Sequence, residues 1–230
     1  GIATFITTNV IPAMSGLGAG IKSAFQWFSD NQGWILPVLA GIGAALLGIA
    51  INIGIMNLAA VIAAAHAIKQ TAGNIPILFT RRSTIEGGEK IALNEGQVLA
   101  MYAAVCESKS IDLIDYEMAN DVANIAQVRD VARANGIKLV LSFHNFSYTP
   151  GLEALGEKFL RADQLGADVA KVAVMPRDLD DVLALLLATR EASKKLRIPL
   201  ISMSMGPLGA LTRMVGGAFG SALSFAVGAS

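Results

Sequence analysis

One short stretch, residues 167–175, constrains this chain more than any other. It ends at Pro176 and is almost entirely small and apolar, yet Lys171 lies in its middle. On a β-strand, Val169, Lys171 and Ala173 would share one face, and the other face would be wholly apolar. A strand that is apolar on both faces is typical of a parallel sheet covered on both sides. The stretch therefore predicts a buried parallel strand.

Lysine is almost never fully buried without a partner. Burial disfavours the charged form of an amine, and a neutral amine can attack a ketone as a nucleophile. The alternative is a lysine near a strand end whose ammonium group extends to solvent. From this stretch alone, both interpretations of Lys171 remain open.

From residue 74 onward, strand and helix patterns alternate, which is typical of βα units and a parallel sheet. The expected strands are residues 75–80, 111–117, 137–143, 167–175, 198–205 and 219–227. The expected helices are residues 89–107, 121–134, 149–165, 178–196 and 208–215, with Thr149 as the cap of the third. The pattern predicts six strands with five helices between them.

Polar side chains gather at or just beyond the carboxyl ends of these strands, where parallel α/β folds build their sites. They are Arg82, Glu117, His144, Lys171 and Arg213. Each has a structural alternative. The two arginines could be surface charges, and His144 could be a core histidine, although its strand face also holds Ser142 and Lys138. Their shared location favours a site.

Two further acidic residues have ordinary structural explanations. Glu86 follows Ser83 by three residues, so it could complete a capping box. Asp115 shares a strand face with Glu117 and could be a loop or cap acceptor.

The first 73 residues carry only three formally charged side chains, Lys22, Asp30 and Lys69. This change in composition predicts a domain boundary between an apolar helical segment, residues 1–73, and an α/β domain, residues 74–230. Residues 34–68 are expected to form two apolar helices. Their length also fits a membrane span, so membrane contact, packing on the sheet and self-association all remain open.

The whole chain has equal numbers of basic and acidic residues, which gives no electrostatic reason to expect nucleic acid as a partner. A lone cysteine, Cys106, excludes an internal disulfide and fits a reducing compartment such as the cytoplasm. His66 has no second candidate ligand nearby, so no metal site is expected there.

Five blocks, LFTRRSTIEGG (78–88), DLIDYE (112–117), SFHNFSYTP (142–150), KVAVMP (171–176) and SMSMGPLG (202–209), resemble type I 3-dehydroquinate dehydratase in order and spacing. The resemblance covers residues 74–230. Within the first segment, residues 27–34 and the Gly/Ala-rich run that follows are weakly similar to phage tail tape-measure proteins. The dehydratase resemblance implies a (β/α)8 TIM barrel of the shikimate pathway. It also implies a lyase that converts 3-dehydroquinate to 3-dehydroshikimate through a lysine imine, without metal or cofactor.

The resemblance implies a role for each matching residue. Lys171 would form the Schiff base, His144 would move the protons and Glu86 would orient His144. Asp115 and Glu117 would belong to the same polar cluster. Arg213 would pair with the substrate carboxylate and Arg82 would hold substrate hydroxyls.

The family pattern also has parts without a counterpart here. These are its first two strands with a Glu-x-Arg pair, a Ser-Ala-Pro-Gly-Gln lid, and an acidic residue where Asn145 stands. Six of eight strands leave open edges that the apolar segment or a second copy in a homodimer would cover. The resemblance therefore implies a weakened dehydratase. The alternative is a membrane-associated or assembly protein that uses the barrel portion as a scaffold.

Overall fold

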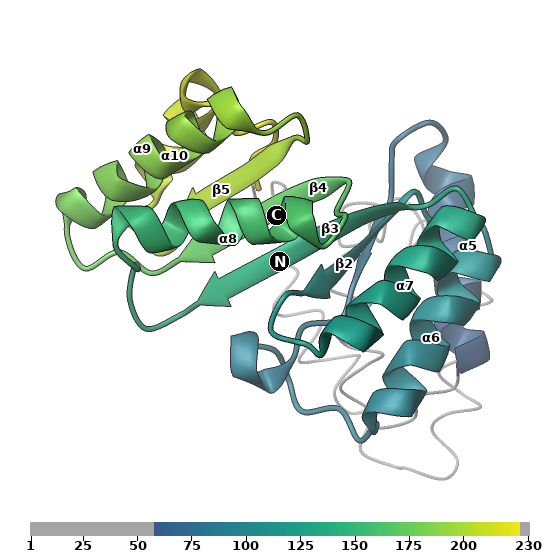
Figure 1. Ribbon diagram of the computed structural model, residues 1–230. Helices are drawn as coiled ribbons and strands as arrows, with labels where there is room; N and C mark the ends of the chain where they lie inside the picture. Colours follow the sequence, from purple (N-terminus) through teal and green to yellow (C-terminus); the bar gives the residue numbers. More distant parts are fainter. Residues whose placement is uncertain (1–57, 226–230) are drawn as a thin grey trace, which may run out of the picture. The chain divides into compact units, whose positions relative to one another are not determined.

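The computed structural model describes residues 58–225, all of which lie within one compact unit of the chain, residues 47–227. These residues contain five strands in a single parallel sheet (Figure 1). The strands are β1 (Leu78–Thr80), β2 (Leu113–Glu117), β3 (Lys138–Asn145), β4 (Val169–Val174) and β5 (Leu200–Ser204). The expected parallel α/β architecture is confirmed for the described part of the chain.

Helices occupy every connection between the strands. They are α6 (Glu95–Glu107), α7 (Val122–Ala134), α8 (Leu152–Gln164) and α9 (Leu179–Lys195), preceded by α5 (Leu58–Ala72) and followed by α10 (Ala210–Val215). Two 3-10 turns, η2 (Thr84–Glu86) and η3 (Gly216–Phe219), complete the fold. Helix α6 begins later than predicted because Asn94 and Gln97 form a reciprocal capping box.

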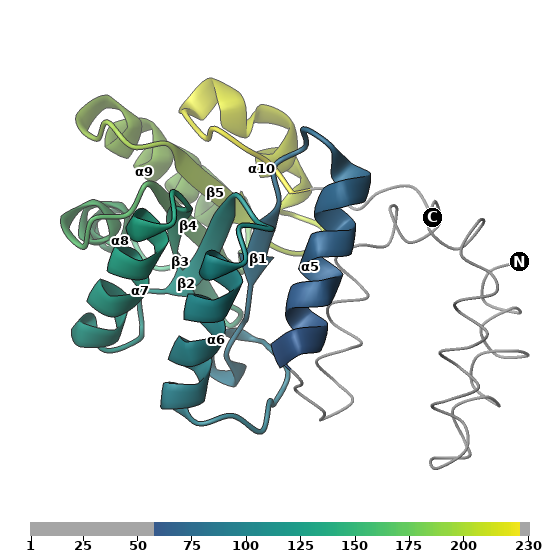
Figure 2. The ribbon, with the colours of Figure 1, turned by 90° about the vertical axis from the view of Figure 1, so that its right-hand side faces the viewer.

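The strands lie in the sheet in sequence order, β1-β2-β3-β4-β5. Crossovers between parallel strands are right-handed. When each new strand is added on the same side of the previous one, all the crossover helices therefore lie on the same face of the sheet. Helices α6 to α9 do line one face of the sheet (Figures 1 and 2). This is the winding of a (β/α) barrel rather than of a doubly wound sheet, whose strand order reverses.

Alternation along each strand separates the two faces of the sheet. The main core lies between the sheet and the helices and includes Leu139, Leu141, Val172 and Leu200. The opposite face carries a small apolar cluster of Ala173, Ile201 and Met203. It also carries most of the buried charged side chains, namely Asp115, Glu117 and Lys171. The polar face is therefore the interior face of the barrel winding.

The strand predicted over residues 219–227 is wrong in its described part. Residues 216–219 form the 3-10 turn η3, and Ser221 makes a single isolated bridge with Leu200. Gly220 adopts a φ of +98°, which turns the chain instead of extending it. The turn itself contains two more glycines, Gly216 and Gly217. The glycine-rich turn therefore interrupts the apolar segment that the sequence pattern assigned to a strand.

The predicted cap at Thr149 is also wrong. The N-cap of α8 is Gly151, which offers no side-chain hydrogen bond. The hydroxyl of Thr149 instead donates to the carbonyl of Met175, which ties the loop after β3 to the end of β4.

Helix α5 packs against α6 and contributes Val61 and Ala65 to the main core. Its Lys69 pairs with Asp112 at 2.7 Å, just before β2. The two apolar helices expected over residues 34–68 lie mostly outside the described residues, and residues 58–68 fall within α5. No helix within residues 58–225 has the length and apolar character that a bilayer crossing requires. The boundary expected after residue 73 stays a prediction.

The two neighbouring α8 residues Phe159 and Leu160 test where the core lies. Phe159 is fully buried, whereas Leu160 is 46% exposed. Phe159→Ala leaves a cavity and is expected to lower the free energy of unfolding by about 3–5 kcal/mol. Leu160→Ala, the matched control, should change it by less than about 1 kcal/mol. Urea denaturation measures both, and equal losses would contradict this assignment of the core.

Candidate active site

Lys171 and Asp115 form a buried ion pair on the interior face of the sheet. The ammonium Nζ lies 2.9 Å from Oδ2 of Asp115, and the two residues are 6% and 0% exposed. Lys171 therefore does not extend to solvent. Burial by itself raises the pKa of Asp115, but the attraction of Lys171 and Arg82 outweighs it and holds that pKa below its usual range. Asp115 is thus a carboxylate that faces a cationic lysine.

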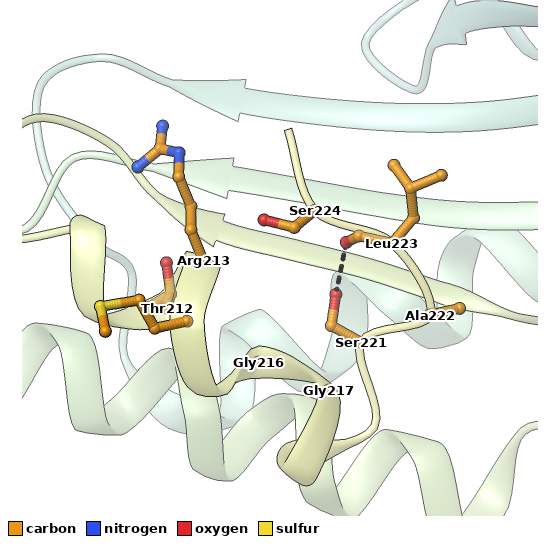
Figure 3. Close-up of a pocket in the computed structure, with 9 residues that line it drawn as sticks. Thr212, Arg213, Gly216, Gly217, Ser221, Ala222, Leu223 and Ser224 are labelled. Carbon is orange, nitrogen blue, oxygen red and sulfur yellow. Dashed lines mark hydrogen bonds between the residues drawn. The ribbon is translucent and has the colours of Figure 1, made fainter. Parts of the chain in front are cut away.

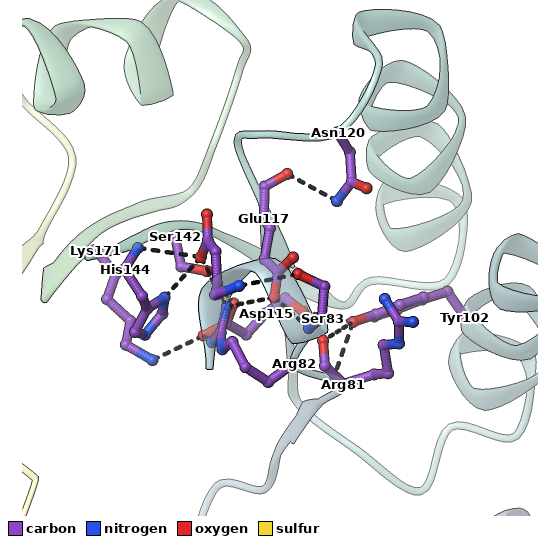
Figure 4. Close-up of polar contacts among 11 residues, drawn as sticks. Arg81, Arg82, Ser83, Tyr102, Asp115, Glu117, Asn120, Ser142, His144 and Lys171 are labelled. Carbon is purple, nitrogen blue, oxygen red and sulfur yellow. Dashed lines mark hydrogen bonds and ion pairs between the residues drawn. The ribbon is translucent and has the colours of Figure 1, made fainter. Parts of the chain in front are cut away.

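Arg82 connects the carboxyl groups of this face (Figure 4). Its Nη2 donates to Asp115 at 3.0 Å, and its Nη1 lies 3.1 Å from Glu117 and 3.4 Å from Glu86. Glu117 also accepts a hydrogen bond from the backbone N–H of Ser83 at 2.7 Å. A guanidinium group suits this task because it presents several donors in a fixed plane.

His144 is joined to Glu86 by two contacts with the same carboxyl oxygen. Oε2 of Glu86 lies 2.9 Å from Nδ1 of His144 and accepts from its backbone N–H at 3.1 Å. Burial, followed by the nearby charges of Arg82 and Lys171, lowers the pKa of His144 to about 3, so the ring is neutral at pH 7. Since Oε2 is an acceptor here, Nδ1 carries the ring proton and Nε2 is left as a base.

Glu86 owes its position to a short loop after β1. Ser83 caps η2 by accepting from the backbone N–H of Glu86, which is half of the capping box considered from the sequence. The carboxyl group of Glu86 turns to His144 instead of completing that box. Gly87 follows with a φ of +83°, and the ring of Phe146 fills the space that a Cβ there would need. Position 87, which follows Glu86 in this loop, therefore favours glycine.

The charges of this cluster balance only if one carboxyl group is neutral. Three acidic side chains, Glu86, Asp115 and Glu117, face two basic ones, Arg82 and Lys171. Burial, and then repulsion by Glu117, raises the pKa of Glu86 to about 8. Glu86 therefore keeps its proton at neutral pH, which spares the interior an uncompensated negative charge. The proton belongs on Oε1, because Oε2 accepts from the backbone N–H of His144.

Arg213 lies apart from this hydrogen-bonded cluster. It belongs to α10 and donates from Nη1 to the carbonyl of Ser204 at 3.2 Å and from Nε to the carbonyl of Phe225 at 3.1 Å. It lines a cavity of about 290 Å³ together with Thr212, Ser221 and Ser224, among others (Figure 3). Neither Lys171 nor His144 lines that cavity. The ring of Phe225, however, lies 4.7 Å from Nζ of Lys171, so the two regions adjoin.

The structure thus brings together six of the seven predicted site residues. The seventh, Arg213, makes no hydrogen bond or ion pair with them, and Phe225 lies between Arg213 and Lys171. The sequence analysis did not propose Ser142, Phe225 or Phe146. Ser142 had a signal in the sequence, since it shares a strand face with His144 and Lys138, which makes that face polar for a core strand. Phe225 had none, because its segment was expected to be a strand. Within residues 58–225, no three His, Cys, Asp or Glu side chains are arranged to hold a metal ion.

Comparisons with known proteins identify relatives over most of the chain. A family model described as type I 3-dehydroquinase matches residues 42–230, so the match begins before the blocks noted in the sequence. A 3-dehydroquinate dehydratase of Albidiferax ferrireducens is 78% identical over 173 residues, which are 75% of this chain and 66% of the relative.

Solved structures agree with this relationship. A crystal structure of 3-dehydroquinate dehydratase from Geobacillus kaustophilus aligns with a TM-score of 0.74 and 49% identity, covering 76% of this chain and 67% of that one. A type I 3-dehydroquinate dehydratase from Clostridium difficile, crystallised with covalently modified comenic acid, aligns with a TM-score of 0.71 and 36% identity over 74% and 66% of the two chains. This chain spans about two thirds of the length of the relatives it matches.

Glu86→Gln is expected to change how stability depends on pH. The folded chain keeps the Glu86 proton up to about pH 8, whereas the unfolded chain loses it near its ordinary pKa of 4.5. Between these values unfolding releases a proton, so rising pH destabilises the parent, by up to about 1.4 kcal/mol per pH unit from this group. The glutamine variant lacks this contribution.

Urea denaturation from pH 5 to 8 measures the difference, and the free energy of unfolding of the variant should rise relative to the parent across that range. Glu89→Gln, which removes an exposed carboxyl group three residues further on, serves as the control. A constant difference between Glu86→Gln and the parent would mean that Glu86 is ionised in the folded chain.

Proposed function

Because this chain belongs to the type I 3-dehydroquinase family, we propose that it eliminates water from 3-dehydroquinate to give 3-dehydroshikimate. The observation that carries the proposal is the buried Lys171, paired with Asp115 and one strand away from His144. A lysine at such a position can form an imine with a ketone, and a neutral histidine beside it can move protons.

The first step is imine formation at Lys171. The ammonium first gives up a proton, and the neutral nitrogen then bonds to the ketone carbon. The carbon–oxygen bond breaks, and the oxygen leaves as water with that proton and a second one from the nitrogen. Overall, an ammonium and a ketone give an iminium and water, so the positive charge on the nitrogen is kept. Asp115 faces a positive charge on the Lys171 nitrogen before and after this step and keeps Arg82 as its second partner, so its buried carboxylate needs no new partner as the imine forms.

The second step is the elimination itself. The iminium draws electrons from the adjacent carbon, and Nε2 of His144 takes a proton from it to leave a neutral enamine. The enamine electrons expel the hydroxyl group on the next carbon, and His144 returns its proton to that oxygen, which departs as water. Hydrolysis of the remaining iminium then releases the ketone product and restores Lys171. Glu86 supports both transfers by holding Nδ1 of His144.

Substrate contacts complete the proposal. Arg213 would pair with the substrate carboxylate and Arg82 with its hydroxyls, beside Asp115 and Glu117. Arg82 already pairs with the carboxyl groups of Glu86, Asp115 and Glu117, so it also positions these three side chains. Arg213 uses Nε and Nη1 for the carbonyls of Phe225 and Ser204, so Nη2, which makes no hydrogen bond within residues 58–225, is the nitrogen that would meet the carboxylate. A homodimer and a cytoplasmic location remain part of this proposal, and the buried Cys106 suits a reducing compartment.

Borohydride reduction in the presence of 3-dehydroquinate tests the imine. The parent chain should gain one covalent adduct, and peptide mapping by mass spectrometry should locate it at Lys171. Lys171→Ala should abolish trapping. Lys138→Ala removes the lysine of β3, which pairs with Asp168 near solvent, and should leave trapping unchanged. If a folded sample traps nothing, or is labelled at Lys138, the scaffold interpretation replaces the enzymatic one.

His144→Ala separates the two steps. Without its base the chain should still form the imine, because the ring of His144 makes no hydrogen bond with Lys171. Turnover to 3-dehydroshikimate should fall by about 10²–10⁴-fold, the usual contribution of general acid–base catalysis. Ultraviolet absorbance of the conjugated product measures turnover. Turnover equal to that of the parent would rule out His144 as the proton carrier.

A further inference from the structure

Ser142 is a polar residue in the middle of β3 that the proposed mechanism does not use. It is fully buried, and its register partners are Glu117 on β2 and Lys171 on β4. Its side chain thus lies on the interior face, among the charged groups of the cluster (Figure 4). On the interior face of β3, Val140 precedes Ser142 and His144 follows it, so this face also accommodates an apolar side chain and packing alone does not require a hydroxyl here.

Both hydrogen bonds of the Ser142 hydroxyl have a fixed direction. Oγ lies 2.9 Å from Nη1 of Arg82 and 2.5 Å from Oδ1 of Asp115. A guanidinium can only donate and a carboxylate can only accept, so the hydroxyl accepts from Arg82 and donates to Asp115. Ser142 therefore occupies one carboxylate oxygen of Asp115, Oδ1, while the other oxygen is left for the cations.

The second oxygen of Asp115 holds the nucleophile. Oδ2 accepts from Lys171 at 2.9 Å and from Arg82 at 3.0 Å. Without the bond at Oδ1, the carboxylate could rotate and take both Arg82 nitrogens in a bidentate pair, the geometry that guanidinium and carboxylate prefer. That rotation would withdraw Oδ2 from Lys171.

We infer that Ser142 is a positioning residue, which fixes the Asp115 carboxylate so that Oδ2 holds Lys171 in line with the ketone. The inference rests on the proposed function. Ser142 acts through Asp115 and touches no reacting atom. Its loss should slow imine formation more than it weakens substrate binding, since Arg213, the proposed partner of the substrate carboxylate, is held by other groups and makes no hydrogen bond with Ser142.

The test compares Ser142→Ala with Ser204→Ala. Ser204 is an equally buried strand serine whose hydroxyl has no hydrogen-bond partner within residues 58–225, so its loss controls for the substitution itself. The rate of borohydride trapping with 3-dehydroquinate should fall about tenfold to a hundredfold in Ser142→Ala, with the ketone concentration at half-maximal rate changed less than about threefold. Ser204→Ala should match the parent. Ser142→Cys keeps a weak donor of similar size and should fall between them.

A crystal structure of Ser142→Ala, or of Ser142→Cys if the alanine variant does not fold, decides the inference without reference to activity. The carboxylate of Asp115 should be rotated and its Oδ2 no longer in contact with Nζ of Lys171. An unchanged contact, or a trapping rate equal to the parent's, overturns the role of Ser142. Failure of the parent itself to trap the ketone would instead overturn the proposed function, while the structure of the variant would still report on Asp115.

Discussion

The ion pair between Asp115 and Lys171 is the interaction on which the rest of the interior face depends. Both groups are buried, and either charge alone would be costly to hold away from water. Arg82 shares Asp115 with Lys171, and this brings Glu117 and Glu86 within reach of the same guanidinium. With Glu86 protonated and His144 neutral, positive and negative charges cancel. The protonated Glu86 and the neutral His144 therefore suit the charged groups around them.

The fold supplies this arrangement through simple winding. Strands in sequence order bring the carboxyl ends of β1 to β4 to one edge, so residues distant in the sequence become register neighbours. Ser142 lies opposite Lys171, and His144 lies opposite Ala173, one interior position further along. The spacing of two residues on β3 separates the Ser142 hydroxyl, which contacts Asp115, from the His144 ring that we propose as the base. Within residues 58–225, helices α6 to α9 cover the opposite face of the sheet, away from the charged cluster.

Much of this could be predicted from the sequence, because alternating βα patterns and the lone lysine in an apolar strand are local signals. The parallel sheet follows from them, whereas the strand alone left open whether Lys171 is buried or extends to solvent. The blocks that resemble the dehydratase family indicated the remaining members of the cluster. The errors arise where local and tertiary effects compete. Glycines turned the apolar segment after residue 215 into η3, and Thr149 was drawn to Met175 rather than to its own helix. The contacts of Ser142 and Phe225 come from distant strands, a loop and α10, which no local pattern reports.

Carboxyl titration by ¹³C NMR is the most direct test of the charge arrangement around Lys171. Chains labelled at aspartate and glutamate carboxyl carbons would be followed from pH 4 to 9, with Glu86 and Asp115 assigned from Glu86→Gln and Asp115→Asn. We predict that the Glu86 signal titrates near pH 8, whereas the Asp115 signal keeps the shift of an ionised carboxylate throughout. A protonated Asp115 at neutral pH, or a Glu86 that is ionised at pH 5, would contradict the account.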